Sequence, residues 1–237
     1  MISLFKKNRY KLIFKSKLSR YLVYAIGEIL LIVIGILIAL QINNWNSNKQ
    51  SRKQELKIYQ NIKSQVKEDL NELEKVEEIN ANFLEKFEKA NRYILTNNRR
   101  AIDTLAFYTM ALSQFSDFQR SSNIYEILVN SGDIKIMRND SIVNKLQKLE
   151  ISYNFINRLE DIHWELITTE LSPEIKGVLN YTTFKIVKPE KLYSIEIQNL
   201  FFEFINLMKI KRDVYHSVIE DLNHILKTID EEIVQLP

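Results

Sequence analysis

The feature that most constrains this chain is an apolar segment of 21 residues, residues 22–42, that follows a basic N-terminal stretch. A helix that crosses a bilayer needs about 20 consecutive apolar residues, and this segment holds one charged side chain, Glu28. A cleaved signal peptide is the alternative, but its apolar region is usually about 7–15 residues long and precedes a small-x-small cleavage site. Here the run is longer, and Leu37 stands two residues before Ala39. We therefore expect an uncleaved membrane anchor.

The charges on either side of the apolar segment predict its orientation. Residues 1–20 contain seven Lys or Arg and no Asp or Glu, whereas no Lys or Arg occurs in residues 21–48. Basic residues beside a span stay in the cytoplasm, and aromatic rings such as that of Trp45 favour the membrane interface. We expect a basic cytoplasmic tail over residues 1–20 and a transmembrane helix over residues 21–42 of the inner (cytoplasmic) membrane. The C-terminal domain would then lie in the periplasm.

The predicted span has one face that differs from the rest of its surface. At about 100° per residue, Gly35 and Ala39 each lie about 20° from Glu28 around the helix. Small residues let helices approach closely, and a polar side chain prefers protein to lipid. This pattern predicts a packing seam of Glu28, Gly35 and Ala39 that forms a homo-oligomer through the span. The alternative is that Glu28 reaches the interface or is protonated, and that the small residues are ordinary span composition.

The charge balance beyond the span excludes one class of partner. Removing seven basic residues and Glu28 from totals of 33 basic and 30 acidic residues leaves 26 and 29 in residues 43–237. Because a nucleic-acid surface needs a clustered basic face, we expect no nucleic-acid partner. The basic tail instead suits the lipid bilayer, where each basic residue near anionic lipid contributes about 1 kcal/mol. The chain has no cysteine, which excludes disulfides, thiolate nucleophiles and Cys-ligated metals.

The scarcity of turn-forming residues predicts a helical fold. The chain has four Gly and three Pro in 237 residues, far below average usage of roughly 7% and 5%. Sheet-rich folds turn often and need these residues, so long helices are the natural alternative. We expect a polar juxtamembrane linker over residues 43–50 and one helical domain over residues 51–237.

Apolar residues recur at helical spacing from residue 51 for over forty residues. One row has a period of seven and a second row lies three residues later, which is the spacing of a packed helix: Tyr59, Val66, Leu73, Phe87 and Ile94, then Ile62, Val76, Phe83 and Ala90. Asp69 and Asn80 interrupt these rows. A parallel coiled coil or an intramolecular bundle could use this seam, and the interruptions and the aromatic residues favour the bundle.

Four further helices are expected, over residues 103–112, 122–130, 140–170 and 194–234, with residues 171–193 largely irregular. Gly132 stands where a left-handed residue ends a helix, and the sequence Asn139-Asp140-Ser141 is typical of a helix N-terminus. We expect Ile127 and its apolar neighbours up to Ile136 to pack against the long helices. The only strand-like run is Ile134-Lys135-Ile136. The predicted fold class is all-α: one transmembrane helix, then an antiparallel bundle of three long and two short helices.

Few residues suggest chemistry. His216, Glu220 and His224 stand four apart on one helix, as metal ligands can, but they fall on its outward side among other charges. His163 continues an apolar stripe, where a structurally satisfied interior or boundary histidine is a simpler interpretation than a ligand contact. No nucleophile elbow, phosphate loop or His-Glu-x-x-His motif occurs. We expect no catalytic residue, cofactor or metal, and no enzyme.

The stretch of residues 25–46 resembles the start of a family of single-pass membrane proteins from Bacteroidota, a domain of unknown function. The matching elements are Gly27-Glu28, Gly35, Ala39-Leu40 and Asn43-Asn44-Trp45-Asn46. Residues 125–136 are similar to that family's Tyr-x-x-Leu and Ser-Gly segment. The resemblance implies an anchored helical domain in the cell envelope and implies no activity.

Two functions fit these expectations. The first is a membrane-anchored periplasmic scaffold or interaction protein that binds an unidentified envelope protein. The second is a sensory input module that signals through the span to a separate cytoplasmic partner, an idea that rests on architecture alone. A polar pocket between the long helices would favour sensing, and a packed apolar core with a bare outer patch would favour scaffolding.

Overall fold

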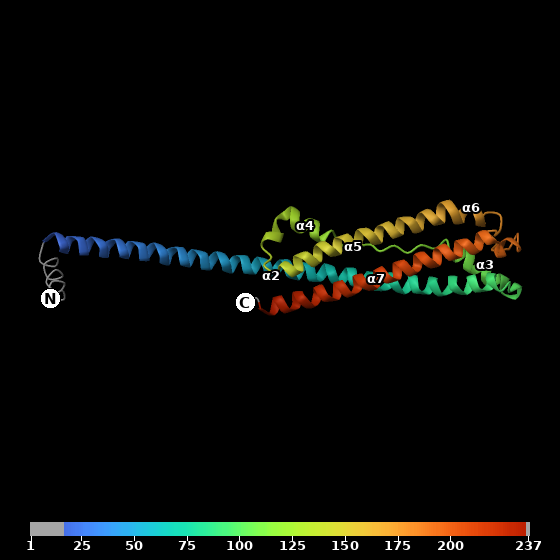
Figure 1. Cartoon of the computed structure of the whole chain (residues 1–237), viewed down its shortest axis with the longest axis horizontal. Coiled ribbons are helices and arrows are strands. Elements are labelled where there is room, and N and C mark those ends of the chain that lie inside the picture. The colour runs from blue at the N-terminus through green and yellow to red at the C-terminus, as the bar shows by residue number, and fades with distance from the viewer. Residues whose placement is uncertain (1–16, 236–237) are drawn as a thin grey trace, which may run out of the picture. The chain divides into compact units, whose positions relative to one another are not determined.

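A computed structural model describes residues 17–235, and the side chains from residue 21 onward (Figure 1). The predicted basic tail, residues 1–20, therefore lies outside the described side chains. The chain divides into two compact units, Met1–Gln54 and Glu55–Pro237. The backbone of helix α2, Lys17–Leu95, includes the polar residues 43–50, which are helical.

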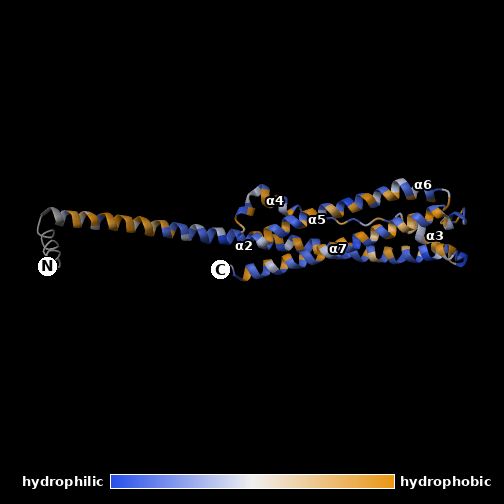
Figure 2. Cartoon of the chain, viewed as in Figure 1, coloured by the Kyte–Doolittle hydropathy of each residue, from blue (hydrophilic) through white to orange (hydrophobic). Residues whose placement is uncertain are grey.

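The first unit contains the apolar part of α2. The helix is long enough to cross a membrane, and one 18-residue window of it is apolar enough (Figure 2). None of that window is buried within the chain. Large aliphatic side chains that remain uncovered are unusual in water. By length, composition and exposure, this helix could cross a membrane.

The second unit is a bundle of three long helices: α2 from residue 55 onward, α5 (Asp140–Glu165) and α7 (Ile195–Gln235). α7 runs antiparallel to both partners. Its start packs on the end of α2, where Phe201 meets Phe87, and its end reaches back to the start of α5. The predicted all-α class, with three long and two short helices, is confirmed.

The shorter elements lie between the long helices. The two short helices that the sequence predicted are α3 (Ile102–Ala111) and α4 (Ile124–Ser131). After α5 the chain stays helical through a π-helix and α6, where we predicted irregular structure from residue 171. The remaining elements are the 3-10 helices η1 (Arg99–Ala101), η2 (Asp133–Lys135) and η4 (Lys191–Tyr193), the π-helix η3 (Leu166–Leu171), and α6 (Ser172–Ile175). Residues 17–235 contain isolated β-bridges and no strand.

The core of the bundle has two parts. One part surrounds Tyr59, Ile142 and Tyr215. In this part, residues 58–76 of α2 pack against α5 and against the C-terminal half of α7. The other surrounds Phe87, Phe201 and Phe204 and includes α3 and residues 171–179. Fully burying one such large side chain stabilises by roughly 1.5–3 kcal/mol, so these rows supply most of the driving force for folding.

The turn before α5 follows the local sequence signals. Gly132 adopts φ +79° at the end of α4, and the Asn139 side chain accepts hydrogen bonds from the Ser141 and Ile142 amides. The strand-like run at 134–136 includes part of the 3-10 helix η2 and forms no strand, as the all-α prediction requires. Of the apolar residues expected to pack here, Leu128 is buried, but the Ile127 side chain is 52% exposed, so the expectation fails for Ile127.

Residues 112–123, which we call the strap, form no regular structure and return along the bundle from α3 to α4 (Figure 1). This return lets α2 and α5 run in the same direction. Phe118 is buried and its ring lies 5.1 Å from that of Tyr153, centroid to centroid. The strap is therefore packed into the bundle.

Candidate functional site

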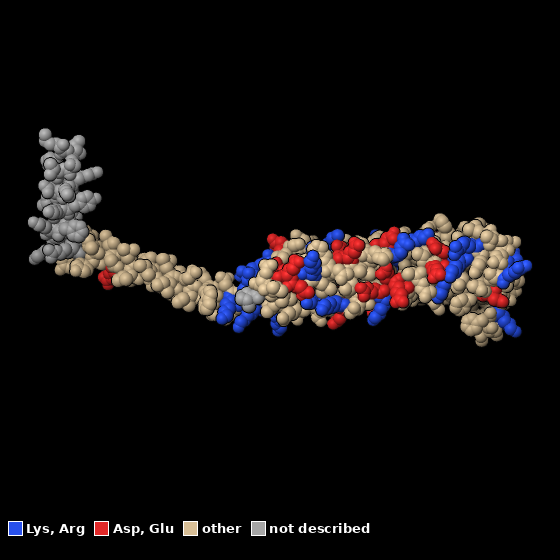
Figure 3. Space-filling model, turned by 90° about the horizontal axis from the view of Figure 1, so that it is seen from below, with Lys and Arg blue, Asp and Glu red and all other residues tan. Residues whose placement is uncertain are grey.

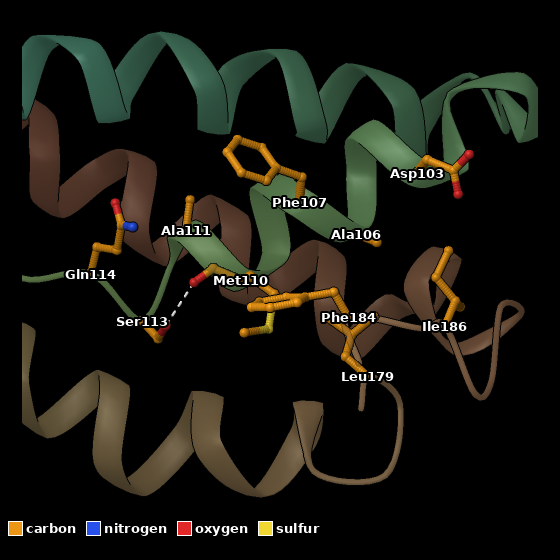
Figure 4. A pocket seen from close by; sticks show the side chains of 10 residues that line it. All are labelled: Asp103, Ala106, Phe107, Met110, Ala111, Ser113, Gln114, Leu179, Phe184 and Ile186. Carbon is orange, nitrogen blue, oxygen red and sulfur yellow. Dashed lines mark hydrogen bonds between the residues drawn. The ribbon is translucent and has the colours of Figure 1, made fainter. Parts of the chain in front are cut away.

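An apolar cleft of about 540 Å³ opens beside α3 (Figure 4). Side chains of α3 line one side, and residues 179–186 line the other. Its lining consists of Asp103, Ala106, Phe107, Met110, Ala111, Ser113, Gln114, Leu179, Phe184 and Ile186. Ligand sites typically have volumes of about 300–1,000 Å³ and mostly apolar walls, so the cleft has the size and character of a binding site.

The α3 wall exists because this helix has apolar residues on both faces. Its inner face buries Leu105 in the core, yet its outer face carries Phe107 and Met110. A helix that is apolar all round is normally covered on all sides. Here the outer face borders the cleft, and the Phe107 side chain is 63% exposed.

The opposite wall is a short irregular segment, residues 176–188, which we call the wall segment. Gly177 at φ +82° turns it away from α6, and the Asn180 side chain accepts hydrogen bonds from the Thr182 and Thr183 amides. Phe184 follows this turn with φ +54° and an exposed fraction of 73%. A left-handed conformation is uncommon for a bulky residue. The turn thus presents a second aromatic ring to solvent at the cleft.

A second group of residues with functional potential is buried inside the bundle. Six polar side chains of the long helices are at most 4% exposed: Glu55, Asp69, Asn80, Glu160, His163 and Lys211. Burying a charge is expensive unless it is paired or hydrogen-bonded. Each of these groups therefore needs a partner or a compensating reason.

Most of these polar groups hold irregular backbone against the helices. The Glu160 carboxylate accepts a 2.8 Å hydrogen bond from the Phe118 amide, and Asp69 accepts one of 2.6 Å from the Ser121 amide. The Lys211 ammonium lies 3.4 Å from the Ser116 carbonyl oxygen. The strap is thus attached by three buried ionisable side chains. Their hydrogen bonds replace those that a helix or sheet would otherwise provide to this backbone.

The same burial shifts their acidities. Burial raises the pKa of Glu160, as does its hydrogen bond with Asp117, whereas the Phe118 amide and Lys211 act in the opposite direction. Burial lowers the pKa of Lys211, and the nearby Glu160 carboxyl partly offsets this shift. The Tyr215 hydroxyl donates to Glu160 at 3.3 Å, and burial raises its pKa.

Among these six residues, Asn80 Oδ1 and both ring nitrogens of His163 have no hydrogen-bond partner within residues 17–235, and His163 alone makes no side-chain hydrogen bond at all. Its ring lies between aromatic rings, 5.1 Å from Phe115 and 5.5 Å from Phe204 between centroids. Within the described part of the chain, neither ring nitrogen has a hydrogen-bond partner. Burial lowers its pKa to about 3, and the Lys211 charge acts in the same direction. The histidine is therefore neutral near pH 7. It occupies the interior position that the sequence favoured, but among the described residues its ring nitrogens are not hydrogen-bonded as that interpretation expected.

The other residues singled out by the sequence lie apart from these two sites. Glu28, Gly35 and Ala39 are exposed on α2, and no atom lies within 4 Å of a Cβ built on Gly35. The Trp45 ring is exposed, with the Lys49 ammonium 5.5 Å from its centroid. The span face is therefore uncovered in the single chain.

The histidines of α7 are on the solvent face. His216 pairs with Glu77 of α2 at 2.8 Å, and the His224 ring nitrogen lies 3.1 Å from the Thr228 hydroxyl. Glu220 is exposed beside them. In residues 17–235, no three His, Cys, Asp or Glu side chains are grouped as a metal site.

Sequence reasoning missed the buried charges, although a signal for them existed. Lys211 occupies the place seven residues from both Phe204 and Val218, and Glu160 lies seven residues after Tyr153. Asp69 and Asn80 were noticed only as interruptions. A polar residue at a core position of a heptad row indicates a buried polar contact. The cleft had no such signal, because its two walls are far apart in sequence.

The described residues thus define a class of protein: a long-helix bundle preceded by an apolar helix of membrane-spanning length. The chain belongs to the family of unknown function DUF6090, whose model matches residues 28–210. No curated protein and no solved structure matches it. The match includes most of the apolar segment of α2, the strap and both walls of the cleft.

Proposed function

We propose that this protein is a membrane-anchored interaction protein of the cell envelope, whose helical domain binds a partner protein at the cleft beside α3. The observation that carries the proposal is the exposure of two large aromatic side chains there, Phe107 and Phe184. Aromatic residues dominate the binding energy of protein interfaces when a partner buries them. A scaffold protein is expected to have a packed apolar core and an exposed apolar patch for its partner, and the cleft provides such a patch.

The location is part of the proposal. The span is placed in the inner membrane, with the N-terminus in the cytoplasm and the domain in the periplasm, and the lipid bilayer is its first partner. Seven basic residues before residue 21 support this orientation. The resemblance of residues 25–46 to envelope proteins of Bacteroidota supports the same placement.

Binding without catalysis is the activity proposed for the domain. Glu160 and Lys211, whose pKa values are shifted by burial, hold the strap, and His163 is enclosed by aromatic rings. A reacting group must be within hydrogen-bond reach of its substrate, and these groups already face protein atoms. The expected partner is an unidentified envelope protein and no nucleic acid.

Self-association through the span is a further part of the proposal. Glu28, Gly35 and Ala39 share one face of α2, and that face is uncovered in the single chain. Close packing against a second copy would shield the carboxyl group from lipid. The uncovered face supports this arrangement without requiring it.

A sensory input module is the second candidate function. The observation that favours it is the buried group of Glu160, His163 and Lys211 between α5 and α7. Buried ionisable groups respond to changes of pH or ligand, and the strap depends on two of them. In this case the signal would need a separate cytoplasmic partner.

Site-specific photo-cross-linking in the native membrane tests the proposal. A photoreactive residue placed at Phe107 or Phe184 should yield a discrete higher-mass adduct with another protein after irradiation of cells. Ile151 on α5 is the matched control, because its side chain is 66% exposed but lies on a different surface.

Equal adducts from position 107 and position 151 would contradict a specific site at the cleft, because exposure alone would then explain the cross-links. Absence of any protein adduct at 107 and 184, with normal expression, would contradict the interaction function itself.

A further inference from the structure

Resting on the proposed function, we infer that the cleft beside α3 accepts a short amphipathic helix of the partner protein, with acidic residues flanking its apolar face. The proposal follows from the shape of the cleft, from the hydrogen bonding of its walls and from the charge of the wall segment.

The shape of the cleft suits a helix. Asp103, Phe107 and Met110 are spaced i, i+4 and i+7, so they form one stripe along α3 over roughly two turns. Between this stripe and the wall segment lie about 540 Å³ of space with apolar walls. A helix laid in an apolar groove contributes anchors at the same i, i+3, i+4 and i+7 spacing.

The hydrogen bonding of the walls argues against an extended peptide. Strand addition requires an edge with unpaired backbone groups. In the wall segment the Asn180 amide donates to the Lys185 carbonyl oxygen at 2.9 Å, and the Val187 amide donates to Val178 at 2.8 Å. The Lys188 amide also donates to Val178. The Asn180, Val187 and Lys188 amides are thus used within the wall segment and do not offer a continuous edge to a strand.

The charge of the wall segment indicates which charged residues should flank the apolar face of the partner helix. Residues 176–189 contain three lysines, Lys176, Lys185 and Lys188, and no acidic residue, and all three are exposed. At this end of the bundle, Figure 3 shows uncharged surface with both basic and acidic side chains around it, so the preference for acidic flanks rests on the wall segment itself. Asp103 is the one acidic residue in the lining and lies on the opposite wall. Complementary charge therefore favours a partner helix whose apolar anchors are flanked by acidic residues on the side that faces the wall segment.

The experiment uses the full chain in nanodiscs of zwitterionic lipid and three synthetic peptides as probes. The first is an amphipathic helix of roughly four turns with Leu anchors and Glu flanks. The second has Lys in place of Glu, and the third is a scrambled form of the first. Because the chain has no cysteine, Gln114→Cys at the cleft gives a single attachment point for an environment-sensitive fluorophore. Empty nanodiscs supply the background.

The acidic peptide should bind about fivefold more tightly than the basic peptide, since two or three exposed charge pairs each contribute modestly. The scrambled peptide should not bind. Lys185→Glu with Lys188→Glu should reverse the order of the first two peptides. The matched control, Lys57→Glu with Lys227→Glu, makes the same change of total charge at exposed positions on α2 and α7 and should preserve the order.

The outcomes separate this inference from the proposed function. Equal affinity of the acidic and basic peptides, unchanged by the lysine variants, overturns the inference but leaves docking at the cleft intact. A stronger response to dispersed anionic lysolipid than to any peptide also overturns it, because the occupant would then be a lipid. If Phe107→Ser leaves binding of the acidic peptide unchanged, the cleft is not the docking site and the proposed function fails with it.

Discussion

At the scale of single residues, polar side chains at core positions determine how the irregular part of the chain is held. Glu55 extends this pattern beyond the strap, because its carboxylate accepts a hydrogen bond of 2.7 Å from the Arg138 amide just before α5. Thus Glu55, Asp69 and Glu160 each hold a backbone amide that has no helical partner. Such contacts are modest in net energy when made and expensive when one partner is removed.

Glu160 gives the clearest test of this role. Glu160→Ala leaves the buried Phe118 amide and the Tyr215 hydroxyl without their acceptor, so we expect a loss of roughly 2–3 kcal/mol in the free energy of unfolding. Glu160→Gln keeps an acceptor oxygen and should lose much less. Chemical denaturation of the detergent-solubilised chain measures both. Equal losses for the two variants would show that the hydrogen bonds to this oxygen are unimportant.

The buried His163 predicts how the free energy of unfolding changes at acidic pH. Its pKa is about 3 in the folded state against 6.5 for the free side chain, so the unfolded state binds more protons between these values. Stability therefore falls as pH drops below about 6.5, by at most about 1.4 kcal/mol per pH unit from this group. His163→Phe should flatten the dependence of the melting temperature on pH between 6.5 and 4. His224→Gln, at an exposed position, should leave the slope unchanged, and an unchanged slope in His163→Phe would contradict a neutral buried histidine.

At the scale of elements, the sequence predicted the helices better than their connections. Heptad rows predicted the three long helices because burial against two neighbours imposes that period on every turn. The strap and the wall segment were not predictable, because their conformations depend on distant partners. Phe118 is 42 residues from Glu160, and the walls of the cleft are more than 60 residues apart. Local propensity carries no information on such contacts.

Gly132 is the element-scale test of the turn after α4. Its φ of +79° is a conformation that a β-branched residue adopts poorly, although no neighbouring atom would clash with a Cβ there. Gly132→Val should therefore destabilise the helical domain by roughly 1–3 kcal/mol through backbone strain alone. Gly132→Asn, which tolerates this region better, should lose less. A thermal melt that Gly132→Val leaves unchanged would count against the left-handed turn.

The span offers the second element-scale prediction. Gly35→Leu places a large side chain on the face shared with Glu28 and Ala39, and it should weaken self-association of the span. Ile34→Leu, about 100° away around the helix, is the matched control and should have little effect. A membrane two-hybrid assay of the isolated span measures both. If both variants and the parent associate equally, the face is only an anchor.

At the scale of the whole molecule, the proposed protein consists of a membrane-anchoring span followed by a domain that binds a partner at one cleft. The two functions require that the domain and the basic tail lie on opposite sides of a membrane. A single cysteine can report the side of each, because the chain has none of its own. Gln114→Cys lies beside the cleft, and Ser16→Cys lies in the tail.

The most direct measurement is therefore labelling of these two single-cysteine variants in cells with a permeabilised outer membrane and an intact inner membrane. With a maleimide that cannot cross the inner membrane, the account predicts rapid labelling at position 114 and labelling at position 16 only after lysis. Protection of position 114 with labelling at position 16 would place the domain in the cytoplasm, and it would contradict both the interaction function and the sensory alternative.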